Sequence, residues 1–321
     1  MRDDDAVAPV VAAMLVLAVI VTFFSVWNAV YLPSLKEQSE MAQDRDAVSA
    51  ISRFSADIST AAALKREMTT SQPFPMGGGG TIFSPLSSAG TLRVNEEPRL
   101  LYTVGITDSG IDYETQGRLV NFSYRPVNDF WIDQGYTWHY GYLNVTQGSS
   151  LHGADGADLS TPLSYPSMKD AYNSTASAGF ARSLVEIEAI PWYNSSANCS
   201  HITVSSVSFS REPDASFISS NGIGTLSLAA AVNETEYGIP EITSPNALVI
   251  RVSRSVPEPF PLALYEHINE TFAGLAVQYP GNLVHTSFTT AAYNETSILP
   301  VPGSLPLTIT HRQILVNVSA Y

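Results

Sequence analysis

The amino-terminal segment constrains this chain most, because residues 6–32 form an apolar run that contains no charged side chain. At a rise of about 1.5 Å per residue, the stretch from Val7 to Trp27 alone is long enough to cross a hydrocarbon core of roughly 30 Å. Trp27 and Tyr31 lie near the end of the run, where aromatic side chains suit the headgroup region of a bilayer. The sequence therefore predicts a short charged leader over residues 1–6 and a transmembrane helix over residues 7–32, with the lipid bilayer as a partner.

A cleaved secretory signal is the main rival interpretation of this segment. Such a signal has a basic head, an apolar stretch of roughly 7–15 residues and a small-residue cleavage site. Here the head carries Arg2 against three Asp residues, and the apolar run is too long. The charges on the two sides of the run are nearly balanced, so the positive-inside rule does not fix the orientation.

Asn-x-Ser/Thr triplets fix the orientation instead, because they accept N-linked glycans on the outer side of a membrane. The chain has fifteen Asn, and Ser plus Thr fill about a fifth of it, so chance alone would supply about three triplets. The sequence has nine, all beyond Ser34, which predicts a cytoplasmic N-terminus and an extracellular carboxyl-terminal portion. The predicted glycosylation sites are Asn121, Asn144, Asn173, Asn194, Asn198, Asn233, Asn269, Asn294 and Asn317.

Composition narrows the possible partners and the folding environment. The formal net charge of −14 disfavours nucleic acid as a partner. Cys199 is the only cysteine, so the outer portion folds without an intrachain disulfide. The roughly 250 residues beyond Thr70 are enough to bury a sizeable core, in one large domain or two smaller ones.

The segment after Pro33 is rich in Ala, Glu, Gln, Lys and Arg, which predicts a helical stalk over residues 33–71. Its apolar stripe indicates docking on the chain's own domain or on neighbouring copies; the stripe residues are Met41, Val48, Ile51, Phe54, Ile58 and Ala62. Residues 72–80 contain two prolines and four glycines, which predicts a linker rather than a phosphate-binding loop.

Short β-branched and aromatic runs separated by turn residues fill the rest of the chain, which predicts a β-rich extracellular domain over residues 81–321. Ile202, Val204 and Val207 alternate with Ser residues, a pattern that favours an antiparallel β-sandwich-like head. One helix is expected over residues 260–275. The strands are expected at 99–106, 119–124, 130–145, 181–190, 202–211, 225–232, 247–253, 283–289 and 307–318.

The sequence predicts no catalytic, cofactor or metal site. The histidines lack metal-binding spacing, no Gly-x-Ser-x-Gly elbow is present, and the acidic run 151–158 lacks the spacing of a calcium loop. An aromatic cluster within residues 130–142 is interpreted as core, with sugar stacking as the alternative. The histidines are His139, His152, His201, His267, His285 and His311.

Residues 3–15, which read DDDAVAPVVAAML, resemble the amino-terminal signature of archaeal type IV pilins and pilin-like proteins. The aromatic run 128–143 is similar to a strand pair of larger members of that group. The resemblance implies that a prepilin-type peptidase cuts between Ala6 and Val7, and that the helix then moves from lipid into a filament core. It also implies copies of this chain or other pilin-like subunits as partners.

The sequence thus favours a non-enzymatic, glycosylated surface protein of pilin-like type that acts by filament assembly or adhesion. Two alternatives stay open. One is a permanently anchored surface domain that does not polymerise, and the other is an anchored extracellular hydrolase or carbohydrate-binding module.

Overall fold

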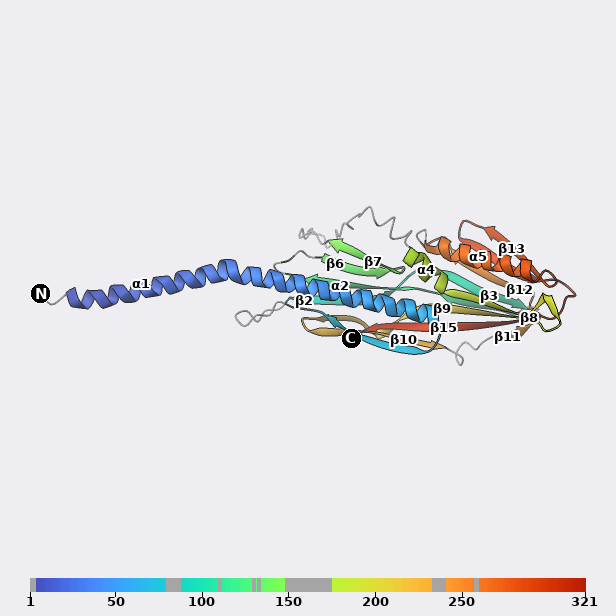
Figure 1. The fold of residues 1–321 in the computed structure, drawn as a ribbon, viewed down its shortest axis with the longest axis horizontal. Helices are drawn as coiled ribbons and strands as arrows, with labels where there is room; N and C mark the ends of the chain where they lie inside the picture. The colour runs from blue at the N-terminus through green and yellow to red at the C-terminus, as the bar shows by residue number, and fades with distance from the viewer. Residues whose placement is uncertain are drawn as a thin grey trace.

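The computed structural model describes residues 4–78, 88–108, 111–128, 131, 134–147, 175–232, 241–256 and 260–321. In this part of the chain, a helical rod at the N-terminus leads into an elongated head made mainly of β-strands (Figure 1). The rod consists of α1 (Asp4–Val26), the π-helical turn η1 (Trp27–Tyr31) and α2 (Leu32–Leu64). The predicted mainly β fold with a long N-terminal helix is confirmed.

The rod ends earlier than predicted. Lys65 adopts a left-handed conformation (φ 47°), and its N–H donates to the Ala61 carbonyl, which closes α2. The next element is strand β1 (Met68–Pro75), where the sequence predicts the end of the stalk and the start of the linker. Its two prolines are tolerated because β1 lies at a sheet edge. The predicted stalk (33–71) and linker (72–80) are corrected accordingly, and the head begins at β1 rather than at residue 81.

Two sheets build the head. The larger has ten strands, with the order β1-β10-β15-β9-β2-β5-β6-β7, while β11 pairs with β15 and β8 with β9. Besides β1 its strands are β2 (Ala89–Glu96), β5 (Val120–Val127), β6 (Gln134–His139), β7 (Tyr142–Gln147), β8 (Val185–Trp192), β9 (Ser195–Ser220), β10 (Ile223–Val232), β11 (Glu241–Thr243) and β15 (Thr308–Ala320).

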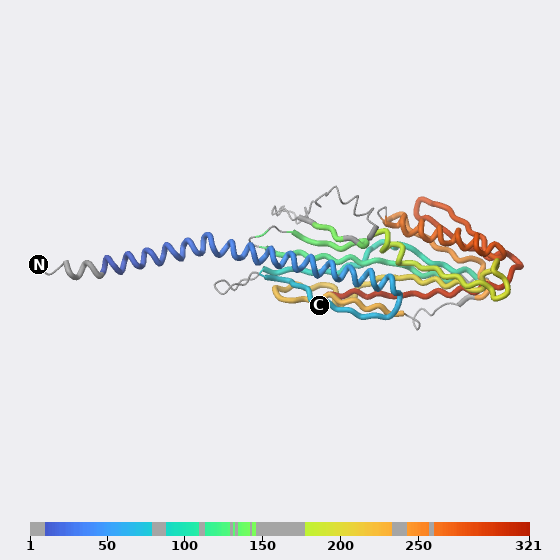
Figure 2. Tube along the Cα trace, viewed as in Figure 1, coloured from blue at the N-terminus to red at the C-terminus, as the bar shows by residue number. Residues whose placement is uncertain are grey.

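The smaller sheet has five strands, with the order β13-β14-β12-β3-β4. Its strands are β3 (Tyr102–Asp108), β4 (Ile111–Gly117), β12 (Ala247–Ser253), β13 (Leu283–Thr289) and β14 (Tyr293–Pro300). The head also contains α4 (Thr175–Ser183) and α5 (Phe260–Gln278). In Figure 2 the red C-terminal strand runs back through the body of the head towards the rod.

One strand pair departs from the antiparallel arrangement predicted for the head. Neighbouring described strands pair antiparallel except β9 and β15, which run parallel from the Thr308–His201 pair onwards. Alternation of buried and exposed residues shows which face of a strand is buried. It carries no information about whether the strand runs parallel or antiparallel to its neighbour. The sequence pattern therefore could not distinguish the two pairings.

The core forms where α2 and α5 cover the sheets. α2 packs along the larger sheet against β1, β10 and β6, and α5 packs against β12, β13 and β14 of the smaller sheet. The two sheets meet where the Tyr102 hydroxyl donates to the Val207 carbonyl (2.7 Å) and where Thr115 Oγ1 lies 3.4 Å from His311 Nδ1. The predicted docking of the helical stripe on the chain's own domain is confirmed, because Phe54 and Ile58 are fully buried in this core.

Most of the expected strands are found, with two local differences. The expected strand at 130–145 is a hairpin of β6 and β7, turned at Tyr140 (φ 49°) and Gly141 (φ 80°), both in the left-handed conformation that two-residue hairpin turns require. The first residues of the expected strand at 181–190 instead complete α4. The helix expected at 260–275 is α5, and the elements that were not predicted are α4, β1, β2, β4, β11 and β14.

Candidate membrane and assembly interface

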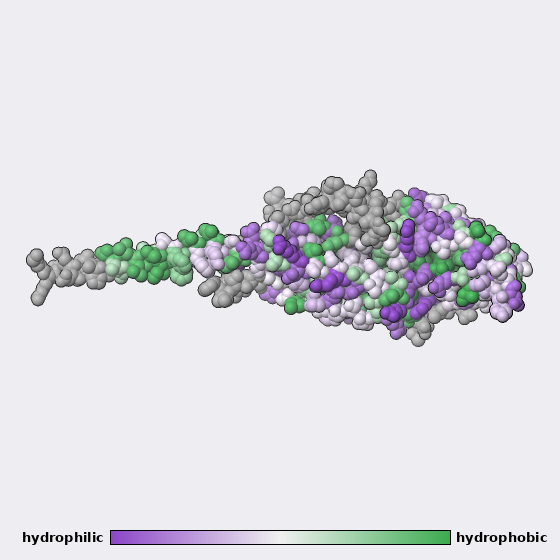
Figure 3. Space-filling view, viewed as in Figure 1, coloured by the Kyte–Doolittle hydropathy of each residue, from purple (hydrophilic) through white to green (hydrophobic). Residues whose placement is uncertain are grey.

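The apolar surface of α1 is exposed all around the helix. Met14, Leu15 and Phe23 are 66%, 63% and 60% exposed, although they point in different directions from the helix axis. Figure 3 shows this surface as a green band along the rod, which contains no buried residue over its most apolar stretch. In the described part of the chain, this is the one helix long and apolar enough to cross a membrane. An exposed apolar surface of this size requires an apolar environment.

Two polar side chains within the rod satisfy their hydrogen bonds inside the helix. The Thr22 hydroxyl donates to the Ala18 carbonyl (2.9 Å), and Asn28 Nδ2 donates to the Phe24 carbonyl (3.0 Å). Within a hydrocarbon core an unpaired polar group costs several kcal/mol, so this pairing matters. These residues are therefore compatible with burial in lipid or against other helices.

A π-helical turn separates α1 from α2. The N–H of Leu32 donates to the Trp27 carbonyl, five residues back, and Pro33, which has no N–H to offer, follows at once. A widened turn before proline lets the helix continue while relieving the clash between the ring and the preceding turn. The rod changes direction between its free end and the head (Figure 1), which is the expected effect of such a turn.

An aromatic ladder follows one side of the same junction. The ring centroids of Phe23 and Trp27 are 6.1 Å apart, and those of Trp27 and Tyr31 are 4.3 Å apart. Trp and Tyr carry both an apolar ring and a polar atom, which suits the boundary between acyl chains and water. The junction is thus chemically matched to the level where the rod would leave a bilayer.

Polar contacts hold the N-terminal half of α2 against the head. Gln43 donates through Nε2 to the Tyr124 hydroxyl (2.8 Å) and accepts from the Ser88 hydroxyl (2.8 Å). Tyr136 donates to Asp44 Oδ2 (2.6 Å). Burial raises the pKa of Asp44, only partly offset by the Tyr136 hydrogen bond, and burial also raises the pKa of Tyr124 to about 12. Each of these side chains is held by partners far away in the sequence.

Aromatic packing continues this attachment along α2. Phe54 meets Phe122 edge to face at 5.3 Å, and Phe122 stacks on Trp138 at 5.4 Å. The Trp138 indole N–H donates to the Ser55 hydroxyl (2.8 Å). Tyr136 and Trp138 are buried, so for these members of the aromatic cluster the core interpretation is confirmed. α2 and the head therefore pack as one unit.

The predicted glycosylation sites differ in accessibility. Asn194 and Asn317 are exposed, and Asn294 is buried at 9% exposure. Asn269 is half-buried, and its Oδ1 accepts from the Thr296 hydroxyl (3.2 Å) and lies 3.1 Å from His285 Nε2. Asn121, Asn144 and Asn198 are half-buried, whereas Asn173 and Asn233 lie outside the described residues.

The predicted cleavage site between Ala6 and Val7 lies within α1. The candidate calcium run 151–158 and His152 lie outside the described residues. Among the residues that the structure describes, no group of three or more His, Cys, Asp or Glu side chains could hold a metal ion.

One serine–histidine pair does come together. Ser206 Oγ lies 2.8 Å from His311 Nε2, but Thr115 rather than a carboxylate stands at Nδ1. His311 is fully buried, which lowers its pKa from 6.5 to about 4. The pair lies where the two sheets meet, out of reach of a substrate, and its geometry is that of a satisfied polar contact in the core.

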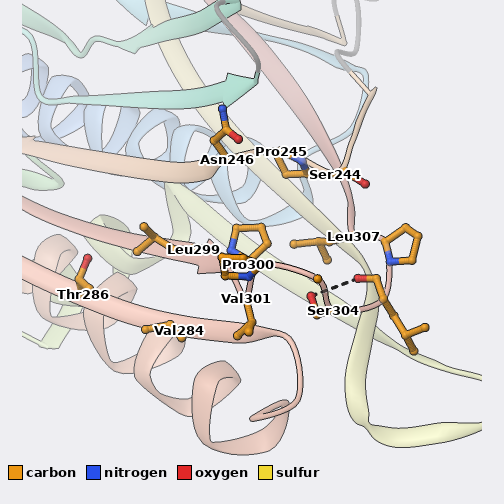
Figure 4. A pocket seen from close by; sticks show the side chains of 14 residues that line it. Ser244, Pro245, Asn246, Val284, Thr286, Leu299, Pro300, Val301, Ser304 and Leu307 are labelled. Atoms are coloured by element: carbon orange, nitrogen blue, oxygen red, sulfur yellow. Dashed lines mark hydrogen bonds between the residues drawn. The ribbon is translucent and has the colours of Figure 1, made fainter.

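An open groove with a volume of about 650 Å³ lies beside the chain segment that joins β14 to β15 (Figure 4). Val284, Leu299, Val301 and Leu307 give it an apolar floor and wall, and Figure 4 shows the Ser304 hydroxyl directed along the connecting segment. None of the described residues that line this groove carries an ionisable side chain, so this lining contributes no general acid or base.

Comparisons of the chain with protein-family models, with curated protein sequences and with solved structures found no match. Function is consequently inferred from the geometry of the rod and of the head. Sequence reasoning found the apolar helix but missed the π-helical turn and the contacts of Gln43 and Asp44. Pro33 indicates a kink or the first turn of a new helix but not its π-helical form, whereas the polar contacts have no signal in the local sequence.

Proposed function

We propose that this chain is a membrane-anchored, outward-facing surface protein of pilin-like type that acts by assembly or adhesion and not as an enzyme. The observation that carries the proposal is the apolar surface of α1, which is exposed on all sides although its helix continues into a well-packed head. Lipid or the α1 helices of other subunits can cover this surface equally well, because both are apolar. This fits the resemblance of residues 3–15 to archaeal type IV pilins.

The outward placement of the head is supported by the exposed acceptor residues Asn194 and Asn317. Glycopeptide mass spectrometry of the protein isolated from cells should find sugar at these positions. Head peptides without any glycan, together with a protein recovered from the soluble fraction, would contradict the proposal.

Processing of the leader separates pilin-like assembly from permanent anchoring. Amino-terminal sequencing of membrane-derived protein should give a mature chain that begins at Val7 if a prepilin-type peptidase acts between Ala6 and Val7. A chain that retains Met1 would favour the permanently anchored alternative. The hydrolase alternative has less support, because the serine–histidine pair is buried and the described lining of the groove has no ionisable side chain. The sugar-binding alternative has less support, because Tyr136 and Trp138 of the aromatic cluster are buried.

We also infer that the two sheets act as a sandwich-like head. Support comes from the Tyr102–Val207 and Thr115–His311 contacts between the sheets. A sandwich-like arrangement gives a head that holds its shape without disulfides, as an extracellular domain with one cysteine requires.

A further inference from the structure

The smaller sheet has an unprotected edge at β13. Proteins usually protect exposed edges with proline, charge or cover, because an unpaired strand is a template for another strand. β13 reads Leu-Val-His-Thr-Ser-Phe-Thr and has neither proline nor a charged Lys, Arg, Asp or Glu side chain. Among the other edge strands that the structure describes, Pro73 and Pro75 stand in β1, Glu114 in β4, and Glu186 and Glu188 in β8, whereas β7 resembles β13 in having neither proline nor charge.

β13 also presents apolar side chains to solvent. Val284 and Phe288 lie on the same face of the strand and are 47% and 49% exposed. The one titratable residue, His285, turns to the opposite face, where its Nε2 lies 2.9 Å from Thr296 Oγ1. Burial lowers the pKa of His285, so the strand is uncharged at neutral pH. In a chain with a net charge of −14, this strip can meet an identical strip without charge repulsion.

We propose that β13 pairs with β13 of a second copy of this chain, antiparallel about a two-fold axis at Thr286. In this register Val284 of each copy lies opposite Phe288 of the other, and Leu283 lies opposite Thr289. Aromatic side chains paired with β-branched ones across antiparallel strands stabilise a sheet. A two-fold axis makes the contact self-complementary and closed, so that it forms dimers.

The neighbouring helices leave room for this pairing. Neighbouring strands in a sheet are about 4.8 Å apart. Across the dimer the strand order is β14, β13, the partner's β13 and the partner's β14. Three spacings therefore separate the two β14 strands, which lie roughly 14 Å apart. α5 packs over β12, β13 and β14, so the two α5 helices lie on the same face at a similar separation. Packed helices need about 8–10 Å between their axes. The dimer therefore extends one sheet across both copies without a clash of α5 against its counterpart.

The direction of β13 determines how the two copies face each other. β13 runs lengthwise along the head, in the part far from the rod (Figure 1). Antiparallel pairing consequently points the two rods in opposite directions, with the far parts of the heads side by side. This orientation rests on the proposed function: with α1 in a membrane, the dimer joins copies anchored in two facing membranes. The pairing of the strands does not depend on that function.

Disulfide crosslinking of the full chain in detergent tests the pairing. T286C places two thiols opposite each other at the axis, at a Cα separation of about 4.5–5.5 Å that a disulfide spans. Oxidation should convert most of the protein to a covalent dimer. The matched control is S71C, an exposed position on the proline-protected edge strand β1, and the native Cys199 is buried. Equal crosslinking of T286C and S71C would overturn the proposal.

A vesicle assay tests the facing orientation. Liposomes that carry the full chain should cluster, and V284K/F288K should reduce clustering at least tenfold while keeping the circular dichroism spectrum, because both side chains are exposed. Clustering that survives V284K/F288K would overturn the inference. If T286C crosslinks but vesicles stay dispersed, the facing orientation is wrong and the pairing holds. A chain that does not float with the liposomes would instead defeat the proposed membrane function, and the crosslinking result would still decide the pairing.

Discussion

Truncating Phe54 to alanine tests whether α2 is part of the head or a free stalk. The Phe54 side chain is fully buried and meets Phe122 edge to face at 5.3 Å. Phe→Ala changes in a core typically cost about 3–5 kcal/mol, a value that includes the cavity left behind. Ala forms helices better than Phe by up to roughly 0.7 kcal/mol, which offsets only a small part of this loss. We expect F54A to lower the free energy of unfolding by about 3–5 kcal/mol, a large share of the 5–15 kcal/mol typical of a folded protein.

Urea unfolding of the full-length protein in detergent measures this change, with tryptophan fluorescence as the signal because Trp138 stacks on Phe122. R53A is the matched control, since Arg53 precedes Phe54 in α2 and is exposed. R53A should leave the midpoint within the range of ordinary surface substitutions, about ±0.5 kcal/mol. If F54A and R53A unfold at the same urea concentration, α2 does not contribute to the core and the description of rod and head as one unit is wrong.

Three further predictions concern the anchor, the pH dependence and the attachment of α2. V16D places an ionisable group in the middle of α1 and should abolish recovery in the membrane fraction; normal surface display would contradict the placement of the helix. His311 has a folded pKa of about 4 against 6.5 unfolded, so stability is complete above pH 6.5 and falls by roughly 3 kcal/mol as pH drops towards 4. H311Q should flatten that pH profile, and an unchanged slope would refute the assignment. Asp57 accepts hydrogen bonds from Thr70 Oγ1 (3.1 Å) and Gln72 Nε2 (2.5 Å), so D57A should lower the free energy of unfolding in urea by about 1–3 kcal/mol. The control is D46A, because Asp46 is an exposed residue of α2. An equal loss in D46A would rule out a specific role for Asp57.

The sequence predicts those elements whose pattern is local. α5 was expected because Leu264, Ile268 and Phe272 recur at helical spacing, and all three are buried. The bounds expected for β12 and β13 agree with the structure, because each is a short β-branched run between turn residues. In these elements propensity and burial favour the same conformation, so no distant contact is needed to decide it.

Elements that depend on distant partners were missed. β1 contains Gln72, Pro73 and Pro75 and resembles a linker, yet β10 supplies its hydrogen bonds from more than 140 residues further along the chain. The stripe of α2 was placed slightly off its true centre, because Ala47 and Ala50 are fully buried there while Met41 and Val48 are only half-buried. Small Ala side chains let a helix approach a sheet closely, a property that a ranking by hydrophobicity does not capture.

The candidate interface shows the same division. The length and the composition of α1 follow directly from the residues, since a run without charge needs no partner to be recognised. The Gln43–Tyr124 and Asp44–Tyr136 contacts join residues 81 and 92 positions apart, and no local pattern announces them. Polar residues on a predicted helix are expected in water unless the fold brings partners to them.

The lengthwise strands have a mechanical consequence for a protein held at one end. A tensile load between the free end of the rod and the far part of the head would be directed along β9, β10 and β15, with β15 flanked by the other two. Such a load strains many interstrand hydrogen bonds at once in shear, whereas a perpendicular pull would peel them apart singly. The arrangement therefore resists extension most strongly along the long axis of the head.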